Sequence, residues 1–389
     1  MSEYILLIFS LSAILALSPF LSRVSRFPTT VIEVVLGSLA AYVGLIHHNE
    51  FFSIVAEVGF LYLMFLAGLE INLKELLRIQ RDQLQMGLVY LFLLYMFSIL
   101  AHFILHVSAM YVLIFSLISI GVVITLTKEY DKDALWLKLS LQIGVMGELA
   151  SIIALTLASG LLNHGLSPEF AVTMLYLVLS LLGMGILFYV LKVAFWWFPE
   201  LKTVIMPHSD NKEQDIRLSF SLFFIFISVM LMLDLELALG AFIGGLFINA
   251  FFEHKKELPE KLSSFGFGFL VPLFFIHIGS TLDLELLFVK EIIVTALMIT
   301  GAMILIRLLS SVVFFQYLRL RGMIYFALSQ SMPLTLMIAT ATLAHHANSI
   351  DKNHYYAFVL GSILEVVLIL LSIKGIHLIP QKRPKRNRP

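Results

Sequence analysis

The stretch Leu139–Leu161, LSLQIGVMGELASIIALTLASGL, decides the fold, because it is long and apolar and holds one ionisable residue, Glu148. About 20 apolar residues are enough to cross a bilayer, so the sequence predicts a membrane-spanning helix over 135–162. A carboxylate near the middle of such a helix is costly to bury, and a functional role is the default hypothesis for it. No Lys or Arg occurs between Lys138 and Lys192, so a charge partner has to come from elsewhere in the chain.

The composition of the whole chain indicates a polytopic membrane protein. Its 389 residues are 60% hydrophobic and 13% charged, with a mean hydropathy of +0.96. A soluble domain is about 45–50% apolar and about 25% charged. The absence of cysteine excludes disulfides, thiolate metal sites and cysteine nucleophiles. No basic region precedes the first apolar run, which favours a retained first span over a cleaved signal peptide.

Hydropathy predicts an all-α protein with thirteen membrane-spanning helices and no soluble domain. The predicted spans run near 3–22, 29–47, 51–69, 84–106, 109–127, 135–162, 169–197, 216–233, 237–252, 263–279, 288–317, 322–345 and 354–376. The single transmembrane domain, 1–389, then divides into repeat one (about 3–162), a linker helix (about 169–197), repeat two (about 216–376) and a basic tail (377–389).

The basic residues predict the orientation of these spans. Of the 26 Lys and Arg residues, Lys192 and Arg307 lie within spans, and Lys290 and Lys352 follow even-numbered spans. The remaining 22 follow odd-numbered spans or lie in the tail. By the positive-inside rule the N-terminus is outside and the C-terminus is cytoplasmic. The location expected from this is the inner (plasma) membrane.

Three sequence matches, each seven spans apart, predict that the two halves are inverted repeats. An odd offset gives the two copies opposite topology, which is a common plan of secondary transporters. The matched segments are GLEINLKELL (Gly68–Leu77) with GSTLDLELL (Gly279–Leu287), GSLAAYVG (Gly37–Gly44) with GAFIGGLF (Gly240–Phe247), and Gly144/Glu148 with Gly361/Glu365 in a Gly-x-x-x-Glu pattern.

Spans 5 and 12 are predicted to be discontinuous crossing helices. Span 5 is rich in small and hydroxyl residues, among them Gly121 and Thr125, and span 12 has Ser331, Met332 and Pro333 at its centre. Proline lacks a backbone N–H and frees a carbonyl in the helix. An ordinary proline kink is the alternative, but each candidate lies one span before the Glu-bearing helix of its half, and this matching position favours an ion site.

Arg307 is the one Lys or Arg deep inside a predicted span, and it needs a carboxylate, helix carbonyls or water. Glu148 and Glu365 are the two deep acids. We favour Glu365 as the charge partner, which leaves Glu148 available to bind an ion; a pair with Glu148 is the alternative. The basic tail is predicted to bind anionic lipid headgroups. No nucleic-acid partner is expected.

These residues resemble the second branch of the monovalent cation:proton antiporters, which includes bacterial Na+/H+ antiporters and the membrane part of Kef-type systems. The resemblance covers nearly the whole chain and rests on LYLMFLAGLEINLKEL (Leu61–Leu76), GAFIGGLFIN (Gly240–Asn249), VPLFFIHIGSTLDL (Val271–Leu284) and the polar span 5. It implies a thirteen-helix inverted repeat with broken spans 5 and 12, a dimer domain and a mobile core. It also implies a homodimer that works by elevator-like alternating access.

The resemblance places Glu148 where the family has its ion-binding aspartate and Arg307 where it has a basic residue. Glu in place of Asp adds a methylene to the site. The preceding residue, often Asn or Asp in electrogenic relatives, is Gly147, which favours electroneutral one-for-one exchange. Only thirteen residues follow the last predicted span, which weakens the interpretation as a ligand-gated Kef-type K+ efflux system.

The expected function is therefore antiport of Na+ or K+ against H+ through Glu148, with Thr125 and Ser331 completing the cation's oxygen shell. No cofactor and no metal other than the transported cation are expected, and the chain is not predicted to be an enzyme, since no P-loop, His-Glu-x-x-His or Gly-x-Ser-x-Gly pattern occurs. The alternatives are a solute or organic-anion symporter on the same scaffold, or a cation channel.

Overall fold

The structure is a computed structural model that describes residues 2–25, 27–47, 50–71, 80–120, 123, 126, 130, 134–165, 167–198, 200, 213–252, 255, 257–282, 284–287 and 289–378. Over these residues the chain is helical and forms no strand. The helices are α1 (Ser2–Ser25), α2 (Thr29–Tyr42), α3 (Glu50–Glu70), α5 (Arg81–Leu105), α6 (Met110–Ser116), α8 (Leu135–His164), α9 (Pro168–Trp197), α11 (Gln214–Met232), α12 (Leu237–Phe251), α13 (Leu258–Phe265), α14 (Val271–Ser280), α15 (Leu284–Leu287), α16 (Lys290–Ser310), α17 (Phe315–Ser329), α18 (Leu334–His346) and α19 (Lys352–Leu378).

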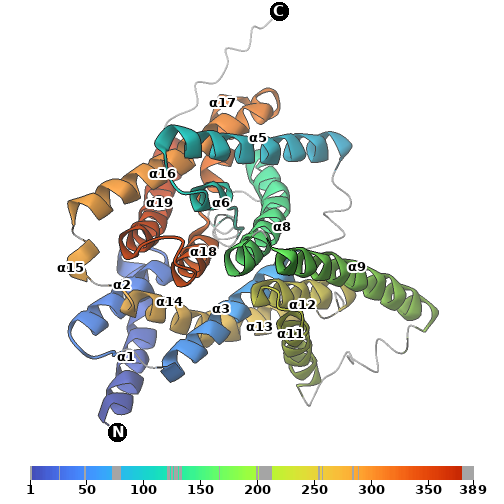
Figure 1. Ribbon diagram of the computed structural model, residues 1–389, viewed down its shortest axis with the longest axis horizontal. Coiled ribbons are helices and arrows are strands. Elements are labelled where there is room, and N and C mark those ends of the chain that lie inside the picture. Colours follow the sequence, from blue (N-terminus) through green and yellow to red (C-terminus); the bar gives the residue numbers. More distant parts are fainter. Residues whose placement is uncertain are drawn as a thin grey trace, which may run out of the picture.

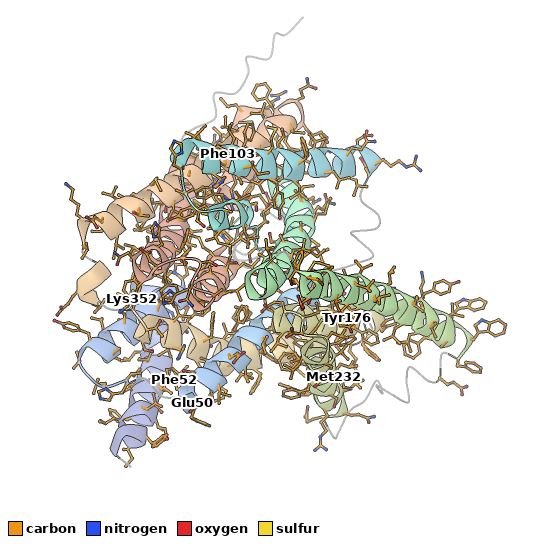
Figure 2. The ribbon with its side chains drawn as sticks, viewed as in Figure 1. Glu50, Phe52, Phe103, Tyr176, Met232 and Lys352 are labelled. Atoms are coloured by element: carbon orange, nitrogen blue, oxygen red, sulfur yellow. The ribbon has the colours of Figure 1, made fainter. Side chains whose placement is uncertain are left out.

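Each predicted span coincides with a helical segment, so the all-α, multi-span fold class is confirmed. Nine helices in the described ranges are long and apolar enough to cross a membrane, and α2, α12 and part of α18 are shorter apolar helices. Large apolar side chains cover the outside, as Phe103, Tyr176 and Met232 do on α5, α9 and α11 (Figure 2). Such a surface is stable in contact with lipid hydrocarbon.

The start of span 10 differs from the prediction, and backbone chemistry explains its course, whereas the junction of spans 11 and 12 falls in the predicted connection. Span 10 begins at Leu258 and passes through a π turn, Gly266–Leu270, before α14. Pro272 cannot donate to the carbonyl four residues earlier, and π turns accommodate such defects. Spans 11 and 12 meet at Arg319, whose φ of 58° and ψ of 175° separate two helices without an intervening loop.

The helices form two groups (Figure 1). The scaffold group contains α1, α2, α3 and α11–α14, drawn in blue and yellow; the crossing group contains α5, α6, α8 and α16–α19, drawn in teal, orange and red. Helix α9 links the groups in sequence and contacts both, through α8 near their connection and through the ring of Phe188, whose centroid lies 4.7 Å from that of Phe251 on α12. The crossing group contains Glu148 and both interrupted spans.

Glycines bring the backbones of the scaffold group into direct contact at two crossings. At the α3–α12 crossing, a Cβ added to Gly68 would lie 1.9 Å from the carbonyl oxygen of Phe242. At the α2–α14 crossing, a Cβ added to Gly279 would lie 2.0 Å from that of Val34. Gly68 and Gly279 begin two segments that match in the sequence. The predicted repeat pairs α3 with α14 and α2 with α12, so it relates the α3–α12 crossing to the α2–α14 crossing.

We expect Gly68→Ala to destabilise the protein by about 1–3 kcal/mol, because the added methyl meets backbone, which cannot rotate away as a side chain would. The matched control is Gly301→Ala on α16, where an added Cβ meets nothing within 4 Å. Alanine is about 1 kcal/mol better than glycine inside a helix. Thermal unfolding in detergent should therefore show a lower melting temperature for the first variant and no loss for the second. Equal melting temperatures would contradict the contact.

Candidate functional site

Both crossing helices are interrupted, as the predicted fold class requires. Helix α6 ends at Ser116, and Leu117 is extended with φ −60° and ψ 135°. Helix α17 ends at Ser329, and α18 begins at Leu334 after four residues outside either helix. The backbone groups of these two breaks, near residues 117–120 and 330–333, are therefore available to side chains or to a ligand.

Helix α8 holds both breaks through one face. Toward the first break, Ser151 Oγ accepts a hydrogen bond from Ile118 N at 2.9 Å. Toward the second, Ser140 O accepts one from Gln330 Nε2 at 2.7 Å, and Ser329 Oγ donates to Ser140 Oγ at 2.7 Å. Because Ser140 and Ser151 are eleven residues apart, or about three turns, they lie on the same side of α8.

Glycines on this face of α8 let the broken segments come close. A Cβ added to Gly147 would lie 2.4 Å from the Ile118 side chain, and one added to Gly144 would lie 2.7 Å from Ile120. The Gly144 position also lies 3.6 Å from the amide of Gln330. Larger residues at either position would push the breaks away from α8, so the glycines set the width of the site.

Glu148 lies between these glycines and Ser151, facing the first break. Its side chain is 1% exposed, and its Oε1 accepts a hydrogen bond from Ser119 Oγ at 3.3 Å. A buried carboxylate that meets a hydroxyl and an unwound backbone has the oxygen chemistry that Na+ and K+ prefer, and it also binds a proton. Within the described residues no cluster of three acidic or histidine side chains forms a metal site.

Arg307 on α16 fastens the two breaks to each other. Its guanidinium is fully buried and donates from Nε to Gln330 O at 2.8 Å, from Nη1 to Phe115 O at 3.1 Å, and from Nη2 to Leu117 O. These carbonyls belong to the C-terminal ends of α17 and α6, where helix dipoles concentrate negative charge. The planar, permanently charged guanidinium matches this fan of acceptors.

The predicted ion pair between Arg307 and Glu365 is not among the contacts of the guanidinium, which also donates to Met303 O at 3.2 Å. Backbone carbonyls supply its counter-charge, and Glu365 on α19 attracts it electrostatically over a longer distance. Glu365 is 0% exposed, and neither carboxyl oxygen has a hydrogen-bond partner in the part of the chain that the structure describes. The alternative pair, Arg307 with Glu148, is likewise not among the guanidinium's contacts.

The remaining predicted site residues fall in different places. Ser331 and Met332 lie in the second break and are 0% and 1% exposed, and Pro333 immediately precedes α18. The Ser331 hydroxyl donates to Ala327 O at 2.9 Å. Gly121 and Thr125 lie outside the described residues, as do the tail residues 379–389.

The sequence analysis did not select Ser140 or Ser151, which supply hydrogen bonds at the breaks. Helical periodicity could have found them, because positions 140, 144, 148 and 151 recur every three or four residues on one face of α8. Ser119 is one of the hydroxyl residues on which the predicted interruption of span 5 rests, but its contact with Glu148 was not predicted.

A bundle of membrane-spanning helices, with two broken helices packed around a buried acid and a buried guanidinium, defines a secondary transporter. The chain belongs to the sodium/hydrogen exchanger transmembrane family, whose sequence model matches residues 10–378. This confirms the monovalent cation:proton antiporter family predicted from the sequence, and it places the chain among transporters rather than enzymes. The likeness to Kef-type systems stays a prediction.

Relatives with sodium/proton antiporter names align over most of the chain. It is 26% identical over 377 residues to the putative Na(+)/H(+) antiporter YjbQ of Bacillus subtilis (strain 168), with 90% of this chain and 59% of that protein covered. It is 24% identical over 302 residues to the probable Na(+)/H(+) antiporter 3 of Methanocaldococcus jannaschii, with 74% of each covered. The chain thus spans less than two thirds of the Bacillus relative.

The fold matches the solved structure of the sodium proton antiporter MjNhaP1 from Methanocaldococcus jannaschii at pH 8. The superposition has a TM-score of 0.69 and covers 97% of this chain and 99% of that chain, at 14% sequence identity. The two proteins therefore share a fold over almost their entire lengths.

Proposed function

We propose that this protein exchanges a monovalent cation, Na+ or K+, for H+ across the membrane, with Glu148 as the shared binding group. The observation that carries the proposal is a carboxylate buried on α8, hydrogen-bonded to Ser119 at a break in a crossing helix. The family and the names of its aligned relatives support the same activity.

Glu148 binds either a proton or a cation, and this competition couples the two fluxes. A bare carboxylate in this site is costly, so it crosses the membrane with one positive charge bound. Because one acid then exchanges one cation for one proton, transport is electroneutral. Hydroxyls and freed carbonyls complete the cation's shell, with Thr125 and Ser331 as the candidates from the sequence.

Alternating access follows from the two helix groups. The crossing group carries the site, and we propose that it moves against the scaffold group, whose glycine crossings keep it rigid. The two groups draw on both proposed repeats, 3–162 and 216–376, joined by the linker helix 169–197. We further propose a homodimer in the inner membrane, with the N-terminus outside, the C-terminus cytoplasmic and the basic tail on anionic headgroups.

Cation-induced proton flux in proteoliposomes tests the activity. We expect Na+ or K+ added outside to dissipate an imposed pH gradient, at a rate that does not change with a membrane potential set by an ionophore. The series Na+, K+ and Li+ identifies the cation. Cation flux that ignores the proton gradient would indicate a channel, and no proton movement with any of the three cations would favour solute symport.

We propose that Glu365 adds a more distant negative charge near Arg307 and does not carry the transported ion, because neither of its carboxyl oxygens accepts a hydrogen bond from a hydroxyl in the described residues. Glu365→Gln should therefore keep the cation concentration for half-maximal exchange unchanged, while thermal stability falls because the guanidinium loses a nearby negative charge. Glu365→Asp, which keeps the charge, is the matched control and should restore stability. Loss of exchange in a folded Glu365→Gln variant would contradict this assignment.

A further inference from the structure

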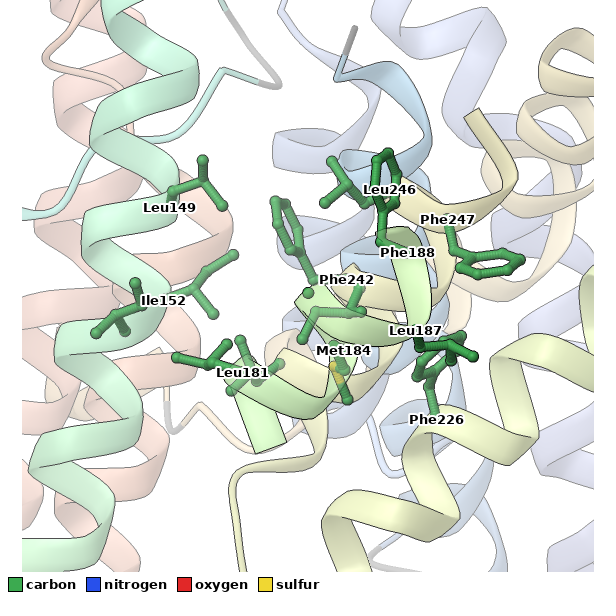
Figure 3. A pocket seen from close by; sticks show the side chains of 14 residues that line it. Leu149, Ile152, Leu181, Met184, Leu187, Phe188, Phe226, Phe242, Leu246 and Phe247 are labelled. Atoms are coloured by element: carbon green, nitrogen blue, oxygen red, sulfur yellow. The ribbon is translucent and has the colours of Figure 1, made fainter. Parts of the chain in front are cut away.

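A cavity separates the crossing group from the scaffold group at the middle of α8 (Figure 3). Its volume is about 260 Å³, and its walls come from α8, α9, α11 and α12, with Leu149, Ile152, Leu181, Met184, Phe242 and Leu246 among the lining residues. Near their connection α8 and α9 are in contact, since a Cβ added to Gly160 would lie 3.0 Å from Met174. Farther along, the two helices face each other across the cavity.

The lining of the cavity is aliphatic and aromatic, with one methionine and one glycine. Water is not stabilised in such a space, because a buried water molecule needs about three hydrogen-bond partners and the lining side chains offer none. An empty space of this size forfeits the dispersion contacts of its walls. The chemistry of the walls therefore selects a hydrocarbon occupant.

The cavity also reaches the surface that faces lipid. Leu187 lines it and is 43% exposed, and Gly185 lines it and is exposed as well. The neighbouring side chain of Ile186 is 64% exposed on the same helix. In the bilayer these residues are in contact with acyl chains, so hydrocarbon is present at high concentration at the entrance.

We propose that an acyl chain of a bilayer lipid occupies this cavity, inserted between α8 and α12 past Gly185. Leu149, which lines the cavity, directly follows Glu148 in the chain. The acyl chain would lie between α8, which carries Glu148, and α12 of the scaffold group. It would fill the space at which the crossing group and the scaffold group face each other. The inference concerns lipid binding and does not depend on the proposed antiport.

Photolabelling in reconstituted vesicles tests it directly. The probe is a phosphatidylethanolamine with a diazirine in the middle of one acyl chain, diluted into unlabelled phosphatidylethanolamine and phosphatidylglycerol. After illumination, mass spectrometry of peptides should find label on residues 149–153. Leu149 and Ile153 line the cavity and are partly exposed, so the cavity-filling variants Gly185→Phe and Met184→Trp separate label from a chain inside the cavity from label by surrounding lipid. Absence of label from this segment in the folded wild type would overturn the proposal.

Two glycines on α9 provide matched variants. A Cβ at Gly185 or at Gly183 meets nothing within 4 Å, but only Gly185 lines the cavity. Gly185→Phe should abolish labelling of 149–153, whereas Gly183→Phe should keep it. Met184→Trp, which fills the cavity from a neighbouring position, serves if Gly185→Phe does not fold. Undiminished labelling in folded cavity-filling variants would also overturn the proposal.

Discussion

Glu148→Gln should reduce cation-induced proton flux in proteoliposomes to the level of empty liposomes, while the protein remains folded. Glutamine has nearly the same size, and its amide oxygen can still accept the hydrogen bond from Ser119 Oγ, which lies 3.3 Å from Glu148 Oε1. It cannot hold a proton or a negative charge, so neither substrate is bound. Dissipation of a pH gradient with Na+ and with K+ measures the loss.

The control for this variant is another buried acid in a span. Glu33 on α2 is 3% exposed and accepts a hydrogen bond from Ser18 at 3.4 Å, but it lies in the scaffold group. Glu33→Gln should retain exchange. Glu148→Asp should also retain exchange. Its cation affinity should change, because the aspartate side chain is one methylene shorter and its carboxylate lies closer to the backbone of α8. Full exchange in Glu148→Gln would show that Glu148 is structural and would move the search to Glu365.

Arg307→Ala should be the most destabilising substitution in the crossing group. It removes the donor to Phe115 O, Leu117 O and Gln330 O and leaves these buried carbonyls unpaired at two helix ends. Leaving one buried acceptor without its hydrogen bond costs about 1–3 kcal/mol, and here three acceptors lose theirs. We expect a large fall in melting temperature in detergent and loss of exchange, because both breaks lose their shape.

Arg321→Ala is the matched control. Arg321 also donates to a carbonyl at a helix end, from Nη2 to Ile376 O at 2.6 Å, but it is only partly buried, so water can replace it. Its loss should cost far less stability. Arg307→Lys should give an intermediate result, since a lysine keeps the charge but cannot reach three acceptors in a plane. A normal melting temperature for Arg307→Ala would contradict the role given to the guanidinium.

The sequence could predict the elements of the site because each has a chemical signature. Glu148 and Arg307 stand out as charges in apolar runs, and Pro333 identifies the second break because it cannot donate in a helix. The thirteen spans follow from hydropathy alone. The inverted repeat stays a prediction; Gly68 and Gly279, which begin two of the matched segments, each lie at a close helix crossing.

The partners of Arg307 could not be predicted in the same way. Every residue has a backbone carbonyl, so residue types do not reveal that those of Phe115, Leu117 and Gln330 accept hydrogen bonds from Arg307. The sequence analysis therefore favoured a side-chain carboxylate as the partner. The connection between spans 11 and 12 was predicted at 318–321, where Arg319 lies, but the backbone dihedral angles that make it a single-residue turn could not be predicted, because hydropathy does not report them. Tertiary context decided both.

The position of Arg307 in the chain also determines the order in which the parts of the site are synthesised. Leu117 and Arg307 are 190 residues apart, so the first break is inserted long before its guanidinium exists. At about 5–20 residues per second, a ribosome needs roughly 10–40 s to translate that interval. During this time the carbonyl of Leu117 needs a temporary partner, such as water in the translocation channel. Glu148 is made within the same interval, so α8 is present well before the arginine that joins the two breaks.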